Sequence, residues 1–351
     1  MGRGWGVALS LVLMIGGSAV AHGQTAEDGL DAMRARLAEA PGYTGVFGVA
    51  RAGETAVGTT QGRRVGDDLR WASVTKMVTA ILVLQQVDAG RLSLDAPLAT
   101  YWPEFPVNAD RITVRQLLTH TSGLANPDAL PDADADGMAD FYQQAADWRP
   151  VCSAPAIAEP GADFAYNNCD YLVLGEVLER VTGQDYNALV RSRLVEPLGL
   201  DRVAVPSGPR SEAQAEGGPE PRIDPASWGP AGGLYGSASD LLKIDRALME
   251  GSLISEASRE EMWKGDPAAG FAALSVWSYS PDLGGCLGQT RLVERYGEIG
   301  GVQVRNFLLP DEGVALTVYS DDGETAFGEV WQGQGLSVDL IRAAACGAPG
   351  A

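Results

Sequence analysis

The sequence predicts an α/β fold of the α+β type, in which an antiparallel sheet built from both chain ends is flanked by helices and carries an inserted, mostly helical subdomain. Strand-like patterns near the two ends and helical patterns in the middle of the chain predict this arrangement. Strands from both ends can bury their apolar faces in one common sheet, with the helical segment as an insertion. The strand-like runs cover residues 43–51, 55–60, 272–280, 290–296, 302–309 and 314–320.

The first 21 residues have the features of a secretory signal peptide. Arg3 supplies a short positive region, residues 7–20 are apolar, and Ala19-Val20-Ala21 forms a small-x-small cleavage site. The apolar run is shorter than the ~20 residues that a membrane-spanning helix needs. We therefore expect cleavage after Ala21 and a secreted, periplasmic protein without a membrane span.

The remaining elements follow in chain order. Residues 27–40 have helical spacing, with Leu30, Met33 and Leu37 on one face. After the first two strand-like runs, residues 73–89 are apolar on nearly every side, which indicates a helix buried in the interior. Gly90 closes this helix. Further helices are expected at residues 114–119, 169–181, 184–195, 239–251 and 326–345.

Residues 22–348 are assigned to a single domain. Its α/β part covers about residues 26–90 and 234–348, and its helical part covers about residues 91–233. Hydrophobic residues make up 45% of the chain and charged residues 21%, which is the composition of an ordinary globular protein with a substantial core.

Charge and the scarcity of histidine exclude several classes of protein. The formal charge is -20, and an acidic chain repels the phosphate backbone, so no nucleic-acid partner is expected. The two histidines are His22 and His120, whereas two or three are normally needed around one catalytic zinc in a His-ligated hydrolase. A Ser-His-Asp triad would have to use His120, because His22 lies at the edge of the predicted leader.

The four cysteines are expected to form disulfides, which are the default in an exported chain. Four cysteines allow three connectivities. Proximity in the sequence favours Cys152–Cys169 and leaves Cys286–Cys346. A zinc site of four cysteines is the weaker interpretation, because the chain has no C-x-x-C pair.

The motif Ser73-x-x-Lys76 opens the buried helix. A spacing of three places both side chains on one helix face, and the free amide at the helix start favours a developing oxyanion. A lysine in apolar surroundings is shifted toward its neutral form, which can accept a proton from serine. The alternative is a helix cap followed by a lysine that reaches toward solvent.

A second motif, Tyr166-Asn167-Asn168, directly precedes the predicted helix at residues 169–181. A tyrosine at this place can relay protons, and an asparagine can bind a substrate carbonyl. The alternative interpretation is a packing tyrosine followed by an asparagine that caps the helix.

Taken together, five ordered segments resemble the serine β-lactamase and penicillin-binding-protein superfamily, and within it the class C-like esterases and peptidases. The resemblance covers most of the chain after the leader. The segments are WASVTK (71–76), RLSLDAPL (91–98), VRQLLTHTSGL (114–124), YNNCDYLVLGEVLERVTG (166–183) and AGGLYGSASDLLKI (231–244).

This resemblance implies a role for each motif residue. Ser73 would be the nucleophile, Lys76 its activating partner and Tyr166 the proton relay, while Asn168 would orient the substrate and contact Lys76. Water would hydrolyse the acyl-enzyme, so no cofactor is implied. The oxyanion hole would consist of the amide of Ser73 and that of the residue after the third family motif.

The third motif departs from the family pattern, which places Lys-Thr-Gly or His-x-Gly on an edge strand. We align Glu298-Ile299-Gly300 with it, so that Glu298 and Gly300 contact substrate and Gly301 supplies the second oxyanion amide. A carboxylate there repels anionic substrates unless an arginine such as Arg295 or Arg305 intervenes. The alternative is that this divergent strand is misaligned by one turn.

A histidine and an acidic loop lie outside these motifs. His120 lies in a segment typical of the family's scaffold, and a hydrogen-bonded structural role is expected for it rather than a place in the site. Asp132, Asp134, Asp136 and Asp140 match the first part of a calcium loop, but Gln143 replaces the bidentate glutamate. A solvated acidic loop is the alternative, and no metal is assigned to the catalytic site.

The sequence therefore predicts an exported serine hydrolase that cleaves an ester or amide bond of a small-molecule or peptide substrate through an acyl-enzyme on Ser73. A neutral or cationic substrate is favoured because of Glu298. One alternative is a β-lactamase or peptidoglycan DD-peptidase. The other is a non-catalytic penicillin-binding or sensor-like module.

Overall fold

A computed structural model describes residues 24–60, 62–133, 135, 137–209, 214–215, 218–219 and 223–347. The predicted signal peptide, residues 1–21, lies outside the described residues, as do Asp134 and Asp136 of the predicted calcium loop. No helix in the described part of the chain is both long and apolar enough to cross a bilayer.

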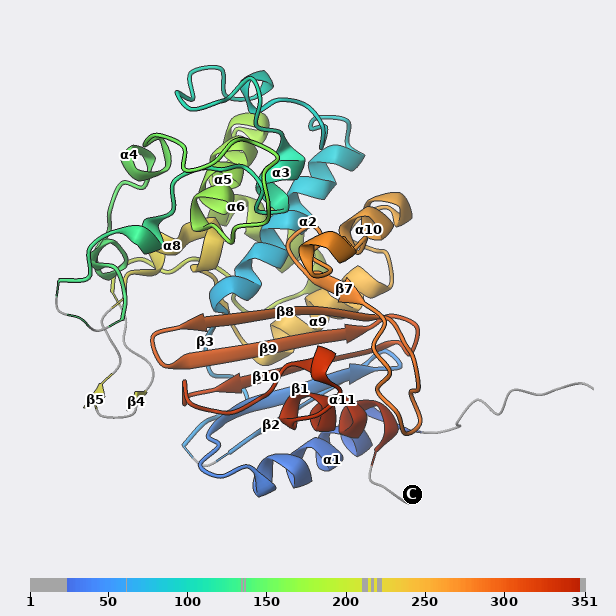
Figure 1. The fold of residues 1–351 in the computed structure, drawn as a ribbon. Helices are drawn as coiled ribbons and strands as arrows, with labels where there is room; N and C mark the ends of the chain where they lie inside the picture. Colours follow the sequence, from blue (N-terminus) through green and yellow to red (C-terminus); the bar gives the residue numbers. More distant parts are fainter. Residues whose placement is uncertain are drawn as a thin grey trace, which may run out of the picture.

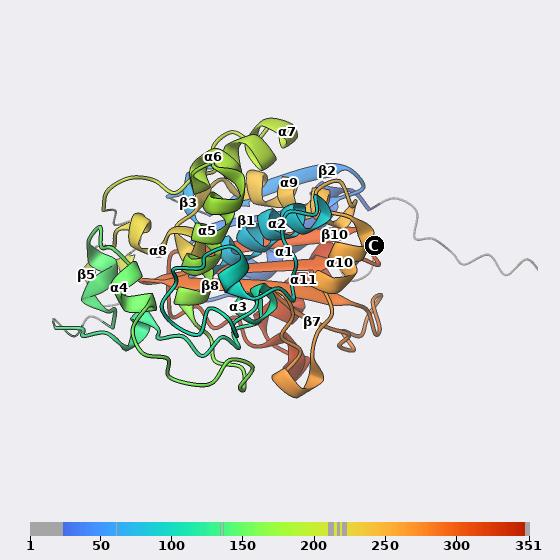
Figure 2. The ribbon, with the colours of Figure 1, turned by 90° about the horizontal axis from the view of Figure 1, so that it is seen from above.

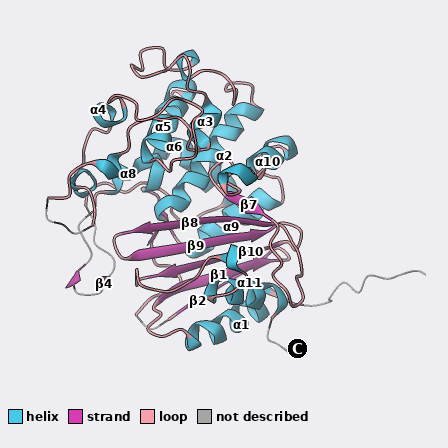
Figure 3. Ribbon diagram, in the orientation of Figure 1, coloured by secondary structure: helices cyan, strands magenta, loops and turns pink. Residues whose placement is uncertain are grey.

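Strands from both chain ends form one antiparallel sheet of six strands, as the sequence predicts (Figures 1 and 3). The N-terminal strand β1 pairs with the C-terminal strand β10, with Gly45 opposite Ser320 and Arg51 opposite Val314. This pairing joins the two ends of the chain and makes the sheet continuous. In spatial order the strands are β2 (Glu54–Thr59), β1 (Gly45–Arg51), β10 (Val314–Ser320), β9 (Val302–Leu309), β8 (Leu292–Ile299) and β7 (Trp277–Tyr279).

Helices cover both faces of this sheet, which explains why β10 along its whole length and β1 from Gly45 to Ala50 are buried and do not alternate. Phe47 and Val49 of β1 face α1 (Ala26–Glu39) and α11 (Leu336–Cys346), whereas Val46 and Ala50 face the larger core. That core includes α2 (Thr75–Asp88) and α9 (Ala238–Met249). Figure 1 shows α1 and α11 together on one face of the sheet.

The helical part packs around α2, which lies near the middle of the molecule in both views (Figures 1 and 2). Every residue of α2 from Thr75 to Leu84 is buried, as a sequence that is apolar on nearly every side predicts. The surrounding helices are α3 (Val114–Leu118), α4 (Arg149–Cys152), α5 (Asn168–Thr182), α6 (Tyr186–Val190), α7 (Glu196–Leu198), α8 (Pro225–Gly232) and α10 (Glu256–Met262). Two short ribbons lie outside the main sheet, β3 (Leu69–Arg70) with β6 (Tyr235–Gly236) and β4 (Gln214–Ala215) with β5 (Gly218–Pro219).

The start of the last helix differs from the prediction, and the backbone shows why. The final helix begins at Leu336 and not near residue 326. Gly328, Gly333 and Gly335 have φ angles of 71°, 71° and 104°, which interrupt a right-handed helix.

The structure contains both disulfides that sequence proximity favours. Cys152–Cys169 joins the end of α4 to the start of α5, and Cys286–Cys346 joins the segment between β7 and β8 to the end of α11. The first bond is close to Tyr166 in the sequence and so anchors the segment that carries it.

A buried carboxyl group lies between α9 and the sheet. Asp245 is fully buried, and its Oδ1 accepts a hydrogen bond of 3.0 Å from Asn306 Nδ2 on β9. Among the described residues, neither Asp245 Oδ2 nor Asn306 Oδ1 has a partner. Burial raises the pKa of Asp245 to about 8, against the opposing effect of the Asn306 hydrogen bond.

Replacing Asp245 by Asn should therefore remove a pH dependence of stability. Between pH 4 and 8 the folded protein retains a proton that the unfolded chain has lost, so the stability of the unmodified protein falls as pH rises, by up to about 1.4 kcal/mol per pH unit. The Asp245→Asn variant lacks this slope, and its relative stability should increase up to about pH 8 and then level off. Urea unfolding from pH 4 to 8 measures the difference in free energy of unfolding between the variant and the unmodified protein. Asp110→Asn, at an exposed position, is the control. Parallel profiles for both variants would contradict the assignment.

Candidate active site

Ser73 lies in a short 3-10 turn, Ala72–Val74, that leads directly into α2. Its side chain is almost buried, with 9% of the residue exposed. The preceding residue, Ala72, has a φ of 45°, a conformation that non-glycine residues rarely adopt. Such backbone strain is often found where a catalytic side chain is held in position.

Lys76 follows one helical turn later and is completely buried. Its Nζ donates hydrogen bonds to Ser73 Oγ at 3.3 Å, Asn168 Oδ1 at 2.7 Å and the carbonyl oxygen of Ala231 at 2.8 Å. Burial lowers the pKa of Lys76 to about 8; the neighbouring Arg295 adds to this effect and Tyr166 opposes it. Lys76 can therefore gain or lose a proton near neutral pH.

Tyr166 and Arg295 complete the surroundings of the Ser73 hydroxyl. Tyr166 Oη is 2.6 Å from Ser73 Oγ and accepts a hydrogen bond of 2.9 Å from Arg295 Nη2. Arg295 Nε also donates to the carbonyl oxygen of Ser73 at 2.8 Å. Burial acts to raise the pKa of Tyr166, but the charges of Lys76 and Arg295 outweigh it, and the pKa is lowered overall. The lowered pKa makes the phenolate, the form of Tyr166 that can accept a proton from Ser73, easier to populate.

Asn168, the first residue of α5, is held by a network that the sequence did not reveal. Its Nδ2 donates to Asp128 Oδ1 at 3.0 Å and to Tyr142 Oη at 3.0 Å, which turns its Oδ1 toward Lys76. Tyr142 Oη donates to Asp128 Oδ1 at 2.6 Å, and the Tyr142 ring stacks on Trp228 with centroids 3.7 Å apart. Asp128 and Tyr142 lie in two short 3-10 turns, Pro127–Ala129 and Asp140–Gln143, that match no motif, so no local signal pointed to them.

The third-motif residues lie differently from the expectation. Gly300 and Gly301 form the two-residue turn between β8 and β9, with φ angles of 53° and 74°. Gly297, three residues earlier, is the residue that lies against Ser73: a Cβ added to it would come within 2.6 Å of the Ser73 amide nitrogen. The segment beside the nucleophile is therefore Arg295-Tyr296-Gly297, which lies three residues before the segment that we aligned with the family motif. A cation two residues before a glycine was the signal that could have shown this.

A cleft of about 230 Å³ opens over these groups. Trp277 of β7 stacks on Tyr296 of β8 with centroids 5.1 Å apart, and the guanidinium of Arg295 lies 5.2 Å from the Trp277 ring. Glu298 also lines the cleft, as expected, whereas Gly300 and Gly301 do not. The lining residues are Ser73, Tyr166, Trp277, Arg295, Tyr296, Gly297 and Glu298.

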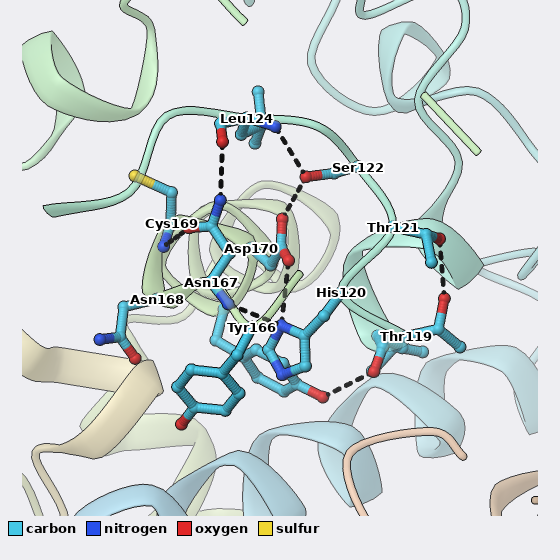
Figure 4. Close-up of polar contacts among 12 residues, drawn as sticks. Thr119, His120, Thr121, Ser122, Leu124, Tyr166, Asn167, Asn168, Cys169 and Asp170 are labelled. Carbon is cyan, nitrogen blue, oxygen red and sulfur yellow. Dashed lines mark hydrogen bonds and ion pairs between the residues drawn. The ribbon is translucent and has the colours of Figure 1, made fainter. Parts of the chain in front are cut away.

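His120 and the described residues of the predicted calcium loop lie outside this cleft. His120 is buried behind Tyr166, and Figure 4 shows it between Asp170 and the Tyr166 segment. Of the predicted calcium ligands within the described residues, Asp132 Oδ2 accepts from the amide of Gly137 and Asp140 Oδ1 from that of Ala133. No cluster of potential metal ligands is found among the residues that the structure describes.

Removing the charge of Arg295 should slow the reaction of Ser73 with a fluorophosphonate probe. In Arg295→Gln the phenol loses a neighbouring cation, its pKa rises, and the labelling rate at pH 7 should fall about tenfold for each pKa unit. Arg295→Lys, which keeps the charge, is the control, and Tyr166→Phe should lose about 10²-fold or more. Equal labelling rates in the protein and all three variants would show that Tyr166 is not the base.

Comparisons with known proteins agree with this geometry. Residues 31–334 match the family described as "Beta-lactamase". The chain is 32% identical over 279 residues to esterase EstB of Burkholderia gladioli, covering 64% of this chain and 71% of that protein. It is 32% identical over 204 residues to penicillin-binding protein 4 of Amycolatopsis lactamdurans, covering 53% and 52%. The chain thus spans about half the length of some of its curated relatives.

Solved structures show the same fold. A D-stereospecific amidohydrolase from Streptomyces has a TM-score of 0.73 and 25% identity, covering 92% of this chain and 99% of that one. A D-amino acid amidase from Ochrobactrum anthropi, solved with L-phenylalanine, has a TM-score of 0.73 and 20% identity, covering 90% and 97%. The fold and the match over residues 31–334 establish that the chain belongs to the beta-lactamase family.

Proposed function

We propose that this protein is an exported serine hydrolase that cleaves an ester or amide bond through an acyl-enzyme on Ser73. The observation that carries the proposal is the 2.6 Å contact between Ser73 Oγ and Tyr166 Oη, with Lys76 and Arg295 both donating toward this pair. A nucleophile within hydrogen-bond reach of a base, with the base held by further groups, is the arrangement that nucleophilic catalysis requires.

The geometry supports the following sequence of proton transfers. Tyr166, as phenolate, accepts the Ser73 proton while Oγ forms a bond to the substrate carbonyl carbon. The protonated Tyr166 then donates to the leaving alcohol or amine as its bond to carbon breaks, which restores the phenolate and leaves an acyl ester on Ser73. Water repeats the two transfers and releases the acid. Lys76 and Arg295 stabilise the phenolate in both halves of the cycle.

The second oxyanion donor is proposed to be the amide of Glu298 in place of that of Gly301. Ile299 and Val302 flank the two-residue turn and are opposite each other. In a two-residue hairpin this flanking pair is the hydrogen-bonded one, so by alternation we infer that the N–H of Glu298 points away from β9. On that side β7 extends only as far as Glu294. The Glu298 amide therefore lies at an open sheet edge, next to the glycine that contacts the Ser73 amide.

Substrates with a neutral or cationic group near the scissile bond are favoured. Arg295 lines the cleft, but its guanidinium is engaged with Ser73 and Tyr166, so its charge serves the catalytic groups and not a substrate carboxylate. The carboxylate of Glu298 and the aromatic pair Trp277 and Tyr296 form the more accessible lining. These features favour an aromatic or cationic ester or amide, and the similarity to an esterase and to amidases supports this class.

A β-lactamase or DD-peptidase activity is the second candidate. The relatives that favour it are penicillin-binding protein 4 and the D-alanyl-D-alanine-carboxypeptidase/endopeptidase AmpH of Escherichia coli, to which the chain is 28% identical over 203 residues. A non-catalytic module is not favoured, because Ser73, Lys76 and Tyr166 retain mutual hydrogen-bonding distances. Export is part of the proposal, supported by the leader sequence and by the two disulfides.

Three probes separate these candidates. The purified protein should hydrolyse a p-nitrophenyl ester, and Ser73→Ala should lose this activity by about 10³-fold or more because the nucleophile is absent. A chromogenic cephalosporin tests the second candidate, since its turnover in place of ester hydrolysis would favour a β-lactamase. Labelling of Ser73 by a fluorophosphonate without any turnover would point to the binding module, and failure to label would reject the nucleophile.

Substitution of Glu298 should change the preference for substrate charge. In Glu298→Gln the ratio of kcat/KM for a cationic ester to that for an anionic ester of the same shape should fall about tenfold, and Glu298→Lys should lower it further. Glu54→Gln, an exposed change on the distant edge strand β2, serves as the control. An unchanged ratio in both Glu298 variants would mean that this carboxylate does not face the substrate.

A further inference from the structure

His120 contacts the chain on both sides of Tyr166. Its carbonyl oxygen accepts from the amide of Ala165 at 2.9 Å, and its Nδ1 accepts from the amide of Asn167 at 3.2 Å. Its ring lies against the Tyr166 ring, with centroids 4.6 Å apart. His120 itself has a φ of 57°, so its backbone is held in the left-handed region while it makes these contacts.

The hydrogen bonds around His120 locate a proton on Asp170. A backbone N–H can only donate, so the Nδ1 atom that accepts from Asn167 carries no proton. Asp170 Oδ2 is 3.0 Å from the same Nδ1. This nitrogen has one lone pair, which the amide of Asn167 already approaches, and a hydrogen on the carboxyl oxygen shares that lone pair and removes the repulsion between the two acceptor atoms. The other oxygen, Oδ1, accepts from Ser122 Oγ, which in turn accepts from the amide of Leu124 (Figure 4).

The surroundings favour the uncharged forms of both His120 and Asp170. His120 and Asp170 are buried, and the charged groups that act on His120 are Lys76 of α2 and Arg295 of β8. Burial, aided by these two cations, lowers the pKa of His120 well below its ordinary value. Burial raises the pKa of Asp170 well above its ordinary value, although Ser122 and Lys76 act in the opposite direction. The ring of Tyr171 also packs on His120, with centroids 5.2 Å apart.

We propose that His120 and Asp170 form a neutral imidazole–carboxylic acid pair that positions Tyr166 for the reaction proposed above. Asp170 and the amide of Asn167 both donate toward the single lone pair of Nδ1, and the hydrogen of the neutral ring is on Nε2, which has no hydrogen-bond partner among the described residues. The pair acts through the Tyr166 segment and has no contact with Ser73 in the hydrogen bonds of the described residues, so both are positioning residues and not members of a Ser-His-Asp relay.

Nitrogen NMR of the full protein tests the protonation state without any assay of turnover. The imidazole signal that disappears in His120→Asn is that of His120, which distinguishes it from His22. We expect a neutral ring protonated at Nε2 and unchanged from about pH 5 to 8, where an ordinary histidine titrates. A ring protonated at Nδ1, or one that becomes an imidazolium in this range, would overturn the proposal.

Paired substitutions test the positioning role. Asp170→Asn keeps a donor toward Nδ1 and an acceptor for Ser122, and His120→Asn keeps an acceptor at the place of Nδ1, so both should stay within about threefold of the unmodified kcat/KM. Asp170→Ala and His120→Phe lose these contacts and should fall about tenfold or more, mainly in kcat, because Tyr166 is no longer held against Ser73. A large loss in Asp170→Asn, equal to that in Asp170→Ala, would show that a carboxylate is required.

Tyr171→Phe is the matched control for lost stability. It removes the buried hydrogen bond from Tyr171 Oη to the carbonyl oxygen of Leu118, at 2.9 Å, in the same cluster. Its melting temperature should fall while kcat stays unchanged; an equal loss of kcat would attribute the effects to packing alone and reject the proposal. If the unmodified protein hydrolyses no ester, the rate of Ser73 labelling replaces kcat. If ester turnover is absent, but His120 is protonated at Nε2 and the variants label Ser73 in the expected order, the hydrolase proposal is rejected and the His120–Asp170 pair is retained.

Discussion

The Tyr166 hydroxyl lies 2.6 Å from Ser73 Oγ and 2.9 Å from Arg295 Nη2, and the Lys76 ammonium lies 4.6 Å from the centre of the Tyr166 ring. Two cations and a phenol are thus buried together. Burial alone would keep the phenol neutral, and the two charges reverse that effect. The rest of the structure can be understood as the means of holding these four groups within hydrogen-bond reach, because charged groups that are buried without partners are very costly.

These four groups come from three parts of the fold. Ser73 and Lys76 lie at the start of the buried helix α2, Arg295 comes from β8 of the sheet, and Tyr166 comes from the segment before α5. The absence of a side chain at Gly297 lets β8 approach the Ser73 amide. Pairing between β1 and β10 makes the sheet continuous, so the strand that carries Arg295 is part of the same rigid body as the N-terminal strands.

Burial also determines which interior groups hold a proton, because it disfavours their charged forms. Asp245 and Asp170 are both buried beside hydrogen-bonding partners that do not carry a compensating charge, and burial raises the pKa of each. Asp170 stands next to a histidine that is itself kept neutral. A pair that could resemble a catalytic relay is better explained as two uncharged groups that hold the Tyr166 segment, while the charge in this region is concentrated on Lys76 and Arg295.

The sequence by itself determined the features that depend on neighbouring residues: the strand and helix types, their order, and the Ser73-x-x-Lys76 spacing on one helix face. The resemblance of the motifs to a family added Tyr166 and Asn168. The tertiary structure decided the rest. The register of β8 brings Arg295 and Gly297 to Ser73 and leaves Gly300 and Gly301 in a turn, and this register depends on pairing with β9, which is not encoded in the local pattern. Likewise, the contacts of Asn168 with Asp128 and Tyr142, and the proton assigned to Asp170, depend on burial and on loops that only the folded chain brings together.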